Sequence, residues 1–530
     1  MTPDFDVIVV GSGMAGVSTA SPLVEAGLRV LMLDGGKRPD IQPPEVDFLT
    51  ARANDTDQWK WMVGENFHAL KMRDAVSPKL RAPTQSYAFE GFDSWNKIEG
   101  DGFITIGSLA TGGLSNAWGC GVSRYSDREM AAFPFPSSGL DFSYAKVSKR
   151  IGISGKSDDD MSGFFGLDEY SQPPIQMDAL HTRLFQRYAH KRDRLISHGF
   201  RMGRSRTAAL SEDISDRKAC NLSCNCLWGC RRHSLYSAVE DLPGLRKHEN
   251  FKELSGFVVD GLTRHDGNWR IEGQNVSDNG RKTITANKIV LAAGTLATTR
   301  IALKALNYNL SVPMLSCPTA AFLLWLPGLL GTPRSPAFGF GQLSFALELQ
   351  GNISGFGSTF STTGIPLSEF ARHVPLRRRY GIDLLRALMS SCVVGNLFLP
   401  GHLTAAEVRL RDDDSLIVSG KYKDEVKPLL DEARSKLRRS YWSLGAILLP
   451  GSFTVGRLGG DIHYAGTLPM RKSPKAGETS HLGEVEGLKG VYITDGACLP
   501  VLPAKSHALT IMANADRIGR SIAQEHISQS

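Results

Sequence analysis

The chain begins with a short apolar run followed at once by closely spaced glycines, and no other stretch limits its fold as strongly. Residues 7–10 are Val-Ile-Val-Val, and residues 11–16 are Gly-Ser-Gly-Met-Ala-Gly. This pattern predicts a β-strand, a tight turn and the first turn of a helix, which together start a βαβ dinucleotide-binding unit. The unpaired backbone amides at such a helix start face the phosphates of the nucleotide. The fold class that follows is α/β.

Each of the three glycines in this stretch has its own physical task. Gly11 permits the turn, Gly13 lets the backbone approach a pyrophosphate closely, and Gly16 lets the helix pack tightly against the strand. A glycine-rich turn that binds no ligand can have the same residue pattern, so the prediction of a nucleotide site depends on the residues that follow.

The residues after the glycines complete the expected unit. A helical pattern covers residues 14–26, Gly27 is placed to end it in a left-handed conformation, and residues 29–33 form a second apolar run. Asp34 follows this run, where an acidic side chain accepts hydrogen bonds from the adenosine ribose. Up to this point the pattern fits NAD and FAD equally.

The size and charge of the chain limit the remaining function classes. Its 530 residues can form more than one domain, and 61 basic against 54 acidic residues give a net charge of +7. Such a small excess argues against a dedicated nucleic-acid-binding protein. The acidic N-terminus runs directly into the first strand without the features of a signal peptide, so we expect a cytoplasmic protein.

Three later segments suggest that the chain returns to the nucleotide. A glycine-rich stretch at residues 107–124 suits backbone that approaches a flat ligand. Residues 251–293 alternate like strands separated by Asp-Gly and Asn-Gly turns, and they end in Ala-Ala-Gly before a helical pattern. Asp495 follows a further short apolar strand in the same way.

Two histidines near the C-terminus are candidates for chemistry. His463 lies in a polar, glycine-rich loop, and His507 stands at the start of a helix expected over residues 509–523. Loop and helix-start positions suit binding and catalysis more than packing, and imidazole can accept a proton near neutral pH. For either histidine taken alone, a structural or surface role stays open.

These residues, in this order, resemble a known family. The chain is similar to the glucose-methanol-choline (GMC) oxidoreductases, which are FAD enzymes that oxidise alcohols. The resemblance covers both ends and the middle strand of the chain. It rests on five elements, namely residues 11–16 with Asp34, the G-G-x-S-x-x-W loop at residues 112–118, the Ala-Ala-Gly at residues 292–294, the H-x-x-G-T-x-x-M element at residues 463–470, and residues 495–500 followed by Thr-Ile-Met-Ala at residues 510–513.

The resemblance implies a discontinuous, two-domain architecture. A Rossmann-like FAD-binding domain, of the type found in GMC enzymes and glutathione reductase, is expected from residues 1–40, 100–130, 220–310 and 455–530. An interleaved α+β substrate-binding domain that contains an antiparallel sheet is expected from residues 41–99, 131–219 and 311–454.

The resemblance also implies which residues bind the cofactor and which react. His463 and His507 match the catalytic histidine pair of the family, whose second member is asparagine in some enzymes. Ala117 stands where members related to pyranose oxidases carry a histidine bonded to the flavin, so we expect noncovalent FAD. The residues expected to bind FAD are Gly11, Gly13, Met14, Ala15, Gly16, Asp34, Gly112, Gly113, Ser115, Asn116, Ala117, Trp118, Val258, Ala293, Gly294, Asp495, Gly496 and Thr510.

The implied reaction is oxidation of a CH–OH group to a carbonyl. Hydride passes from the alcohol carbon to flavin N5 as a histidine, here expected to be His463, takes the hydroxyl proton. By analogy with the pyranose-oxidase-like members the substrate is a sugar or glycoside, and the electron acceptor is oxygen, a quinone or a redox protein. A flavin-dependent isomerase or reductase, and a flavoprotein that has lost its chemistry, stay open as alternatives.

Four of the eight cysteines are crowded into residues 220–230. Cys220, Cys226 and Cys230 resemble the iron–sulfur ligands of GMC dehydrogenases that pass electrons to a partner protein. Thiolates at such spacing suit an iron–sulfur cluster or zinc, and reduced structural thiols are the simpler alternative.

Two further stretches suggest a lipid-linked substrate or contact with a membrane surface. Residues 320–331 are strongly apolar but too short to span a bilayer, and they fit a substrate lid, a core segment or an interfacial anchor. Residues 372–379 contain four arginines and a histidine, which more often form a solvated face.

Overall fold

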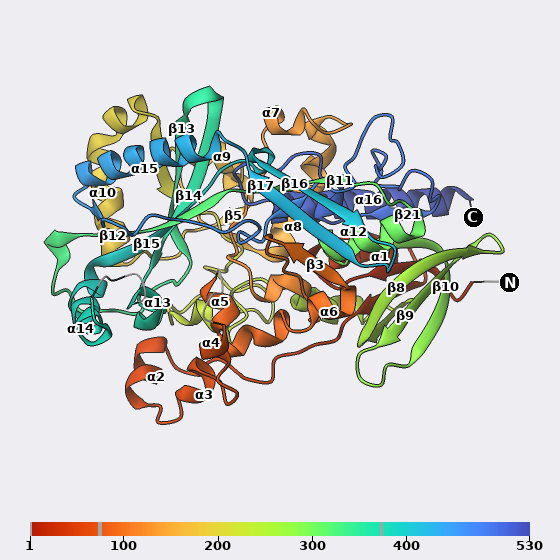
Figure 1. Ribbon diagram of the computed structural model, residues 1–530, viewed down its shortest axis with the longest axis horizontal. Coiled ribbons are helices and arrows are strands. Elements are labelled where there is room, and N and C mark those ends of the chain that lie inside the picture. The colour runs from red at the N-terminus through yellow and green to blue at the C-terminus, as the bar shows by residue number, and fades with distance from the viewer. Residues whose placement is uncertain (1–2, 73–76, 372–373, 375, 530) are drawn as a thin grey trace.

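The computed structural model describes residues 3–72, 77–371, 374 and 376–529, and three larger β-sheets organise them (Figure 1). Strands of the first sheet run in the order β7-β2-β1-β10-β9-β8, and β21 pairs with β10. Strands β7, β2, β1, β10 and β21 pair in parallel, while β8 and β9 extend the sheet as an antiparallel hairpin. The strands of this sheet are β1 (Phe5–Val10), β2 (Val30–Asp34), β7 (Phe251–Ser255), β8 (Phe257–His265), β9 (Asn268–Asn275), β10 (Arg281–Leu291) and β21 (Val491–Ile493).

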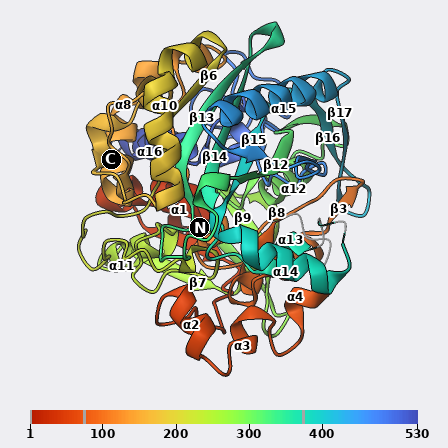
Figure 2. The ribbon, with the colours of Figure 1, turned by 90° about the vertical axis from the view of Figure 1, so that its left-hand side faces the viewer.

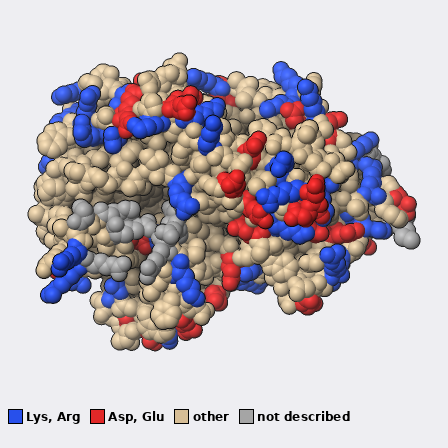
Figure 3. Space-filling view, in the orientation of Figure 1, with Lys and Arg blue, Asp and Glu red and all other residues tan. Residues whose placement is uncertain are grey.

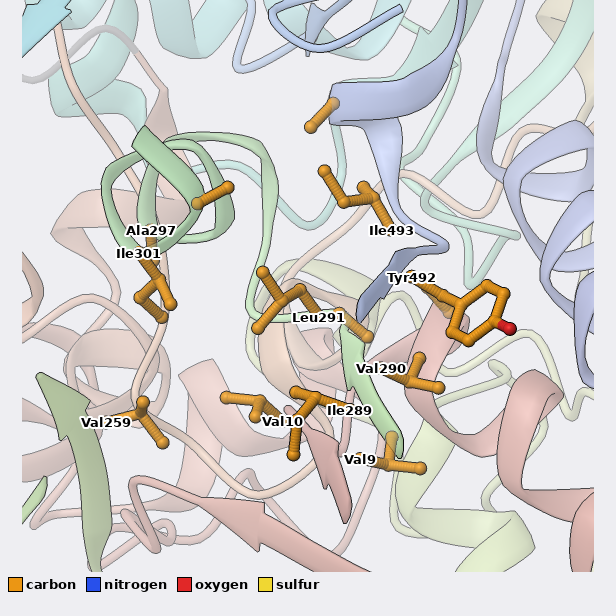
Figure 4. Close-up of a cluster of buried hydrophobic side chains, with 14 of the residues drawn as sticks. Val9, Val10, Val259, Ile289, Val290, Leu291, Ala297, Ile301, Tyr492 and Ile493 are labelled. Carbon is orange, nitrogen blue, oxygen red and sulfur yellow. The ribbon is translucent and has the colours of Figure 1, made fainter. Parts of the chain in front are cut away.

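The central strands are apolar where they are buried, namely β1 at residues 7–10, β2 at residues 30–33 and β10 at residues 289–291. The apolar run at residues 7–10 is at most 5% exposed. Helices α1 (Met14–Glu25) and α16 (Ala508–Gln529) pack against each other beside it, and α12 (Thr295–Ala305) packs near β8. Figure 4 shows how the side chains of β1, β10 and β21 meet those of α12 in one cluster.

The expected βαβ unit is present with small shifts at its ends. The helix begins at Met14 and ends at Glu25, and the following Gly27 has a φ of 87° in the left-handed region. The second strand begins one residue later than expected, at Val30, and includes Asp34 as its last residue.

The second sheet is antiparallel, and its strands lie to the left of β8, β9 and β10 in Figure 1. Its order is β18-β12-β15-β14-β13-β6, and β19 pairs with β12. Helices α10 (Ala179–Ser197) and α15 (Val426–Ser443) pack on one of its faces. Figure 2 shows the molecule from this end, with α10 and α15 toward the viewer. Its strands are β6 (Phe200–Arg204), β12 (Thr319–Trp325), β13 (Gly341–Leu349), β14 (Ile353–Ser361), β15 (Cys392–Phe398), β18 (Ile447–Leu448) and β19 (Thr454–Val455).

A third sheet connects segments that are far apart in the chain. Its order is β20-β11-β16-β17-β3, with β3 (Ile98–Asp101) parallel to β17 (Leu416–Tyr422). At the opposite edge, β20 (Tyr464–Ala465) pairs with β11 (Val312–Ser316), which in turn pairs with β16 (Thr404–Leu410). The loop that contains His463 is therefore fixed beside the end of β11. The domain boundaries expected from the sequence stay a prediction.

The remaining α-helices and strands are short, apart from α8 and α14 with 11 residues each. They are α2 (Phe48–Asn54), α3 (Trp59–Met62), α4 (His68–Lys71), α5 (Pro78–Arg81), α6 (Phe92–Asn96), α7 (Asp127–Met130), α8 (Asp141–Ile151), β4 (Ile153–Ser154), α9 (Ser162–Phe165), β5 (Ser171–Gln172), α11 (Leu242–Leu245), α13 (Leu367–Ala371) and α14 (Arg378–Leu388).

The structure describes the apolar stretch considered for membrane contact, but only part of the basic one. Residues 319–325 form β12, which pairs with strands on both sides, so this part is a core segment of a sheet. In the basic stretch, Arg372 and His373 lie outside the described residues. No helix in the described part of the chain is both long and apolar enough to cross a membrane. On the face shown in Figure 3, basic and acidic side chains are interspersed.

Candidate active site

A cavity of about 920 Å³ connects the first sheet to the second. One end is formed by the loops that follow the parallel strands β1, β2 and β10, and the other by strands β14 and β15. Clefts at the carboxyl ends of parallel strands are the usual ligand sites of such sheets. The expected site residues that line it are Gly11, Gly13, Met14, Ala15, Asp34, Gly113, Ser115, Ala117, Trp118, Val258, Ala293, Gly294, His463, Asp495, Gly496 and His507.

Four expected cofactor residues do not line this cavity. A Cβ on Gly16 would lie 1.9 Å from the Gly11 carbonyl oxygen, so this glycine permits close packing of helix and turn. At Gly112, where φ is 88°, a Cβ would meet Val239. The amide of Asn116 donates to the Thr111 and Gly113 carbonyls and so holds its own loop. Thr510 is fully buried and bonds the Tyr144 hydroxyl at 2.7 Å, which anchors α16 instead.

The turn after β1 leaves room for a ligand at one glycine only. Gly11 has a φ of 107°, and a Cβ there would lie 2.3 Å from the Ala292 carbonyl oxygen. At Gly13 the nearest atoms to a Cβ are 3.9 Å away, on the loop at residues 112–113, and the residue lines the cavity. The turn therefore presents bare backbone and the start of α1 to the cavity, which suits a pyrophosphate.

Asp34 is held in place by two serines. Its carboxylate accepts hydrogen bonds from Ser12 at 2.6 Å and from Ser255 at 2.9 Å. Ser12 also accepts from the backbone amide of Gly112 at 2.9 Å, so it joins the first turn to the second glycine-rich loop. The sequence pattern does not single out Ser12, because that place in the motif accepts any residue.

Asp495 joins the end of β21 to the start of α12. It accepts hydrogen bonds from the Gly294 and Ala497 amides and from the Thr298 hydroxyl. Burial raises the pKa of this carboxyl to about 6 despite these donors. Asp495 therefore connects two loops of the cavity wall.

The two histidines meet in the cavity. The ring centroids of His463 and His507 are 4.7 Å apart, and the rings are nearly perpendicular, at 83°. Within the described part of the chain, Nδ1 of each ring is buried without a hydrogen-bond partner. Burial lowers the pKa of His507 to about 4, and burial together with His507 lowers that of His463 well below its usual value. Both imidazoles are therefore neutral at pH 7 and can accept a proton.

Asp461 lies behind His463 and was not expected from the sequence. Its carboxylate accepts hydrogen bonds from the Ser316 hydroxyl at 3.1 Å and the Cys317 amide at 2.9 Å, and one oxygen lies 3.8 Å from Nδ1 of His463. Burial raises the pKa of Asp461 to about 7. The signal in the sequence is weak, since an acid two residues before a histidine in a loop is common.

A metal site is an alternative interpretation of the group formed by Asp461, His463 and Cys317. Among the described residues, this is the one group of three or more metal-ligating side chains whose ligand atoms all lie within 4.8 Å of one another. However, both oxygens of Asp461 already accept hydrogen bonds, and the Cys317 thiol lies 3.9 Å from the Pro503 carbonyl oxygen. We interpret the group as a support for the His463 ring.

The cysteines of residues 220–230 do not form a comparable group in the part of the chain that the structure describes. Burial raises the pKa of Cys220 to about 11 and that of Cys226 well above its usual value, which favours protonated thiols over metal-binding thiolates. The iron–sulfur hypothesis for Cys220, Cys226 and Cys230 stays a prediction that this geometry does not support.

Lys79 is a further residue of the cavity that sequence patterns missed. Its ammonium donates to the carbonyl of Trp118 and lies 4.3 Å from the centre of the Phe340 ring. Burial lowers the pKa of this amine to about 8. Lys79 therefore places a cation beside the loop at residues 112–118.

Comparison with known proteins gives the fold a name. No protein-family model matches the sequence. The structure of pyridoxine 4-oxidase from Mesorbium loti aligns over 99% of both chains with a TM-score of 0.60 and 15% identity. That of a fungal aryl-alcohol oxidase aligns over 99% of this chain and 100% of the other, with a TM-score of 0.57 and 14% identity. This chain has the GMC oxidoreductase fold.

The expected Rossmann-like and antiparallel parts of the GMC fold are thus confirmed. A curated sequence relative, paromamine 6'-oxidase of Streptomyces fradiae, is 30% identical over 161 residues. The matched region is 28% of this chain and 24% of the relative, so the chain spans about a quarter of the protein that it matches. Within the GMC fold, the cavity with its two histidines is the candidate active site.

Proposed function

We propose that this protein is an FAD-dependent oxidoreductase that oxidises a CH–OH group to a carbonyl. The observation that carries the proposal is the meeting of His463 and His507, 4.7 Å apart, in the same cavity as the glycine turn after β1. The three similar proteins described above are all named as oxidases. Two of these names give the substrate as pyridoxine and as an aryl alcohol.

The residues of the cavity fit FAD. Gly13 would leave the pyrophosphate in contact with bare backbone, and Asp34 would meet the ribose at the end of β2. The loop at residues 113–118 would lie against the flavin ring, and Asp495 with Gly496, which also line the cavity, would meet the pyrophosphate or the ribityl chain. Ala117 offers no atom for a covalent bond to the flavin, so the proposal keeps noncovalent FAD. Bound FAD would supply the hydride acceptor that amino-acid side chains lack.

The histidines would remove the proton of the alcohol and stabilise the negative charge that develops on its oxygen. A neutral imidazole within hydrogen-bond reach of the hydroxyl can take its proton as the C–H bond breaks, and such a base contributes about 10²- to 10⁴-fold to a rate. We assign this role to His463, because Asp461 stands on its Nδ1 side and so leaves Nε2 to the substrate. His507 would bond the same oxygen and stabilise its developing negative charge.

The substrate class is the finer part of the proposal. We propose a hydroxylated ring, such as a sugar or an aminocyclitol glycoside, with oxygen as the electron acceptor. The sequence likeness to paromamine 6'-oxidase and the oxidase names of the structural neighbours support this choice.

Product analysis tests the proposal directly. The purified protein, loaded with FAD in air, is incubated with paromamine, methyl glucoside, pyridoxine and benzyl alcohol in turn. We expect a carbonyl product and an equal amount of hydrogen peroxide with at least one of them. A protein that binds FAD but forms no carbonyl from any alcohol, in air or with a quinone acceptor, would contradict the proposal.

A further inference from the structure

A row of polar side chains crosses the wall of the cavity that the antiparallel sheet provides. Ser205, next to the end of β6, bonds Ser344 of β13 at 2.8 Å, and Ser344 bonds Ser358 of β14 at 2.8 Å. The backbone amide of Ser358 then donates to the side-chain oxygen of Asn396 on β15, also at 2.8 Å. All four residues line the cavity. The row therefore runs continuously across neighbouring strands.

The alternation of the strands places this row between apolar stripes. Residues at i, i+2 and i+4 of a strand share one face. On β14 these are Phe356, Ser358 and Phe360, and on β15 they are Val394, Asn396 and Phe398, all of which line the cavity. A ligand at this wall would therefore meet polar groups in the middle and aromatic rings on both sides.

The polar groups of the row are not all used within the protein. Three serine hydroxyls have three protons, and the two bonds between them use only two. The amide nitrogen of Asn396 has two protons and no hydrogen-bond partner among the described residues. The row thus offers one hydroxyl proton, two amide protons and spare lone pairs to an occupant of the cavity.

The row also lies close enough to the histidines for one substrate molecule to contact both. The Phe398 ring is 4.9 Å from the His463 ring, centre to centre. Asn396 is two residues further along the same face of β15, which corresponds to roughly 7 Å. A six-membered ring whose reacting carbon lies at His463 would therefore extend its other hydroxyls toward Asn396 and Ser358.

We propose that Asn396 and Ser358 form a subsite for the ring hydroxyls of a sugar or cyclitol substrate. This inference rests on the proposed function and extends it to the residues that select the substrate. Hydroxyls both donate and accept, so they can pair with every open group of the row, and the ring C–H edges fit Phe356 and Phe398. An aryl alcohol has no ring hydroxyls, so it would cover the same donors without pairing them, which costs binding free energy.

The test compares two classes of substrate, hydroxylated rings and an aryl alcohol, in three variants of the FAD-loaded enzyme. Asn396→Leu and Ser358→Ala remove the polar groups with little change of volume, and Ser354→Ala, exposed on the same strand β14, is the matched control. The quantity measured is the ratio of kcat/KM for paromamine or methyl glucoside to that for benzyl alcohol. We expect this ratio to fall about 10- to 100-fold in Asn396→Leu and to stay constant in the control.

Several results would overturn the subsite. An unchanged ratio in Asn396→Leu, or a wild-type preference for benzyl alcohol over every hydroxylated ring, would do so. A parallel loss of both activities would show general damage to the site, and Ser358→Ala, the smaller change, then decides by the same ratio.

Failure of the proposed function can be separated from failure of the subsite. If no alcohol is oxidised, binding of paromamine and methyl glucoside to the FAD-loaded protein is measured by calorimetry and by the change in the flavin spectrum. Binding that weakens at least tenfold in Asn396→Leu supports the subsite without the reaction. Equal binding to both proteins, or no binding to the wild type, would overturn it.

Discussion

At the scale of single residues, burial decides what the two histidines can do. Removal from water lowers the pKa of both imidazoles, because the protonated form is charged and the surrounding groups do not compensate for lost hydration. Each ring therefore keeps a free lone pair at neutral pH. The mutual approach of the rings then allows both to reach one substrate oxygen.

The first prediction concerns these rings. His463→Ala should lower the rate of anaerobic flavin reduction by about 10²- to 10⁴-fold, since the proton acceptor is lost. His507→Asn should lose less than His507→Ala, because an amide can still bond the substrate oxygen. His190→Ala, an exposed residue within α10, is the matched control and should react like wild type. Full turnover after loss of both His463 and His507 would instead favour an isomerase or reductase.

The second prediction uses Asp461. Its carboxylate forms as pH rises through about 7, and the negative charge, 3.8 Å from Nδ1 of His463, favours the tautomer that is protonated at Nδ1 and leaves Nε2 as the base. The rate of flavin reduction in the wild type should therefore rise with pH around 7. In Asp461→Asn that rise should disappear and the plateau should fall about tenfold or more. An unchanged pH profile of the variant would refute the role of Asp461.

Residue motifs predicted part of this site. Sequence motifs singled out His463, His507, Asp34 and Asp495, and all four line the same cavity. Asp461 could not be found in this way, because its role depends on contacts with residues 316–317, more than a hundred positions away, which only the pairing of β11 with β20 brings close. Asn396 was missed for the same reason.

At the scale of elements, the unit formed by β1, the glycine turn and α1 could be predicted almost to the residue. Its pattern is local, since the apolar run, the glycines and the left-handed Gly27 follow each other directly. The antiparallel sheet was expected only in outline. Apart from the hairpin of β13 and β14, its strands pair over long sequence separations, and no local pattern sets their order.

The third prediction distinguishes the role of Gly13 in cofactor binding from the role of Gly16 in packing. Gly13 has room for a Cβ that would project toward the cavity, whereas a Cβ on Gly16 would collide with the Gly11 carbonyl. Gly13→Ala should therefore keep the melting temperature of the FAD-free protein and weaken FAD binding, and Gly16→Ala should lower that melting temperature. Calorimetry and flavin fluorescence titration measure the two effects. Equal FAD affinity in Gly13→Ala and wild type would contradict this account of the cradle.

At the scale of the whole molecule, the cavity is shared between the two larger sheets. The loops after β1 and β10 supply one end, and β14 and β15 supply the other. A bound cofactor would therefore contact segments from both ends of the chain and from its middle. Its binding free energy should stabilise the folded protein as a unit.

The fourth prediction follows from that coupling and from Ala117. Addition of FAD at 100 times its dissociation constant should stabilise the FAD-free protein by about 2.7 kcal/mol, visible as a higher melting temperature. Acid precipitation should then leave all the flavin in the supernatant. Flavin that stays with the precipitated protein would show a covalent bond and refute the role given to Ala117.

The central claim is that the paired histidines serve alcohol oxidation by bound FAD. Its most direct test is the visible spectrum of the FAD-loaded protein, mixed without oxygen with paromamine, methyl glucoside, pyridoxine or benzyl alcohol. The account predicts that at least one alcohol bleaches the flavin in the wild type, and that His463→Ala with the same FAD content bleaches at least about a hundredfold more slowly. Flavin that stays oxidised with every alcohol, or that bleaches equally fast in the variant, would contradict it.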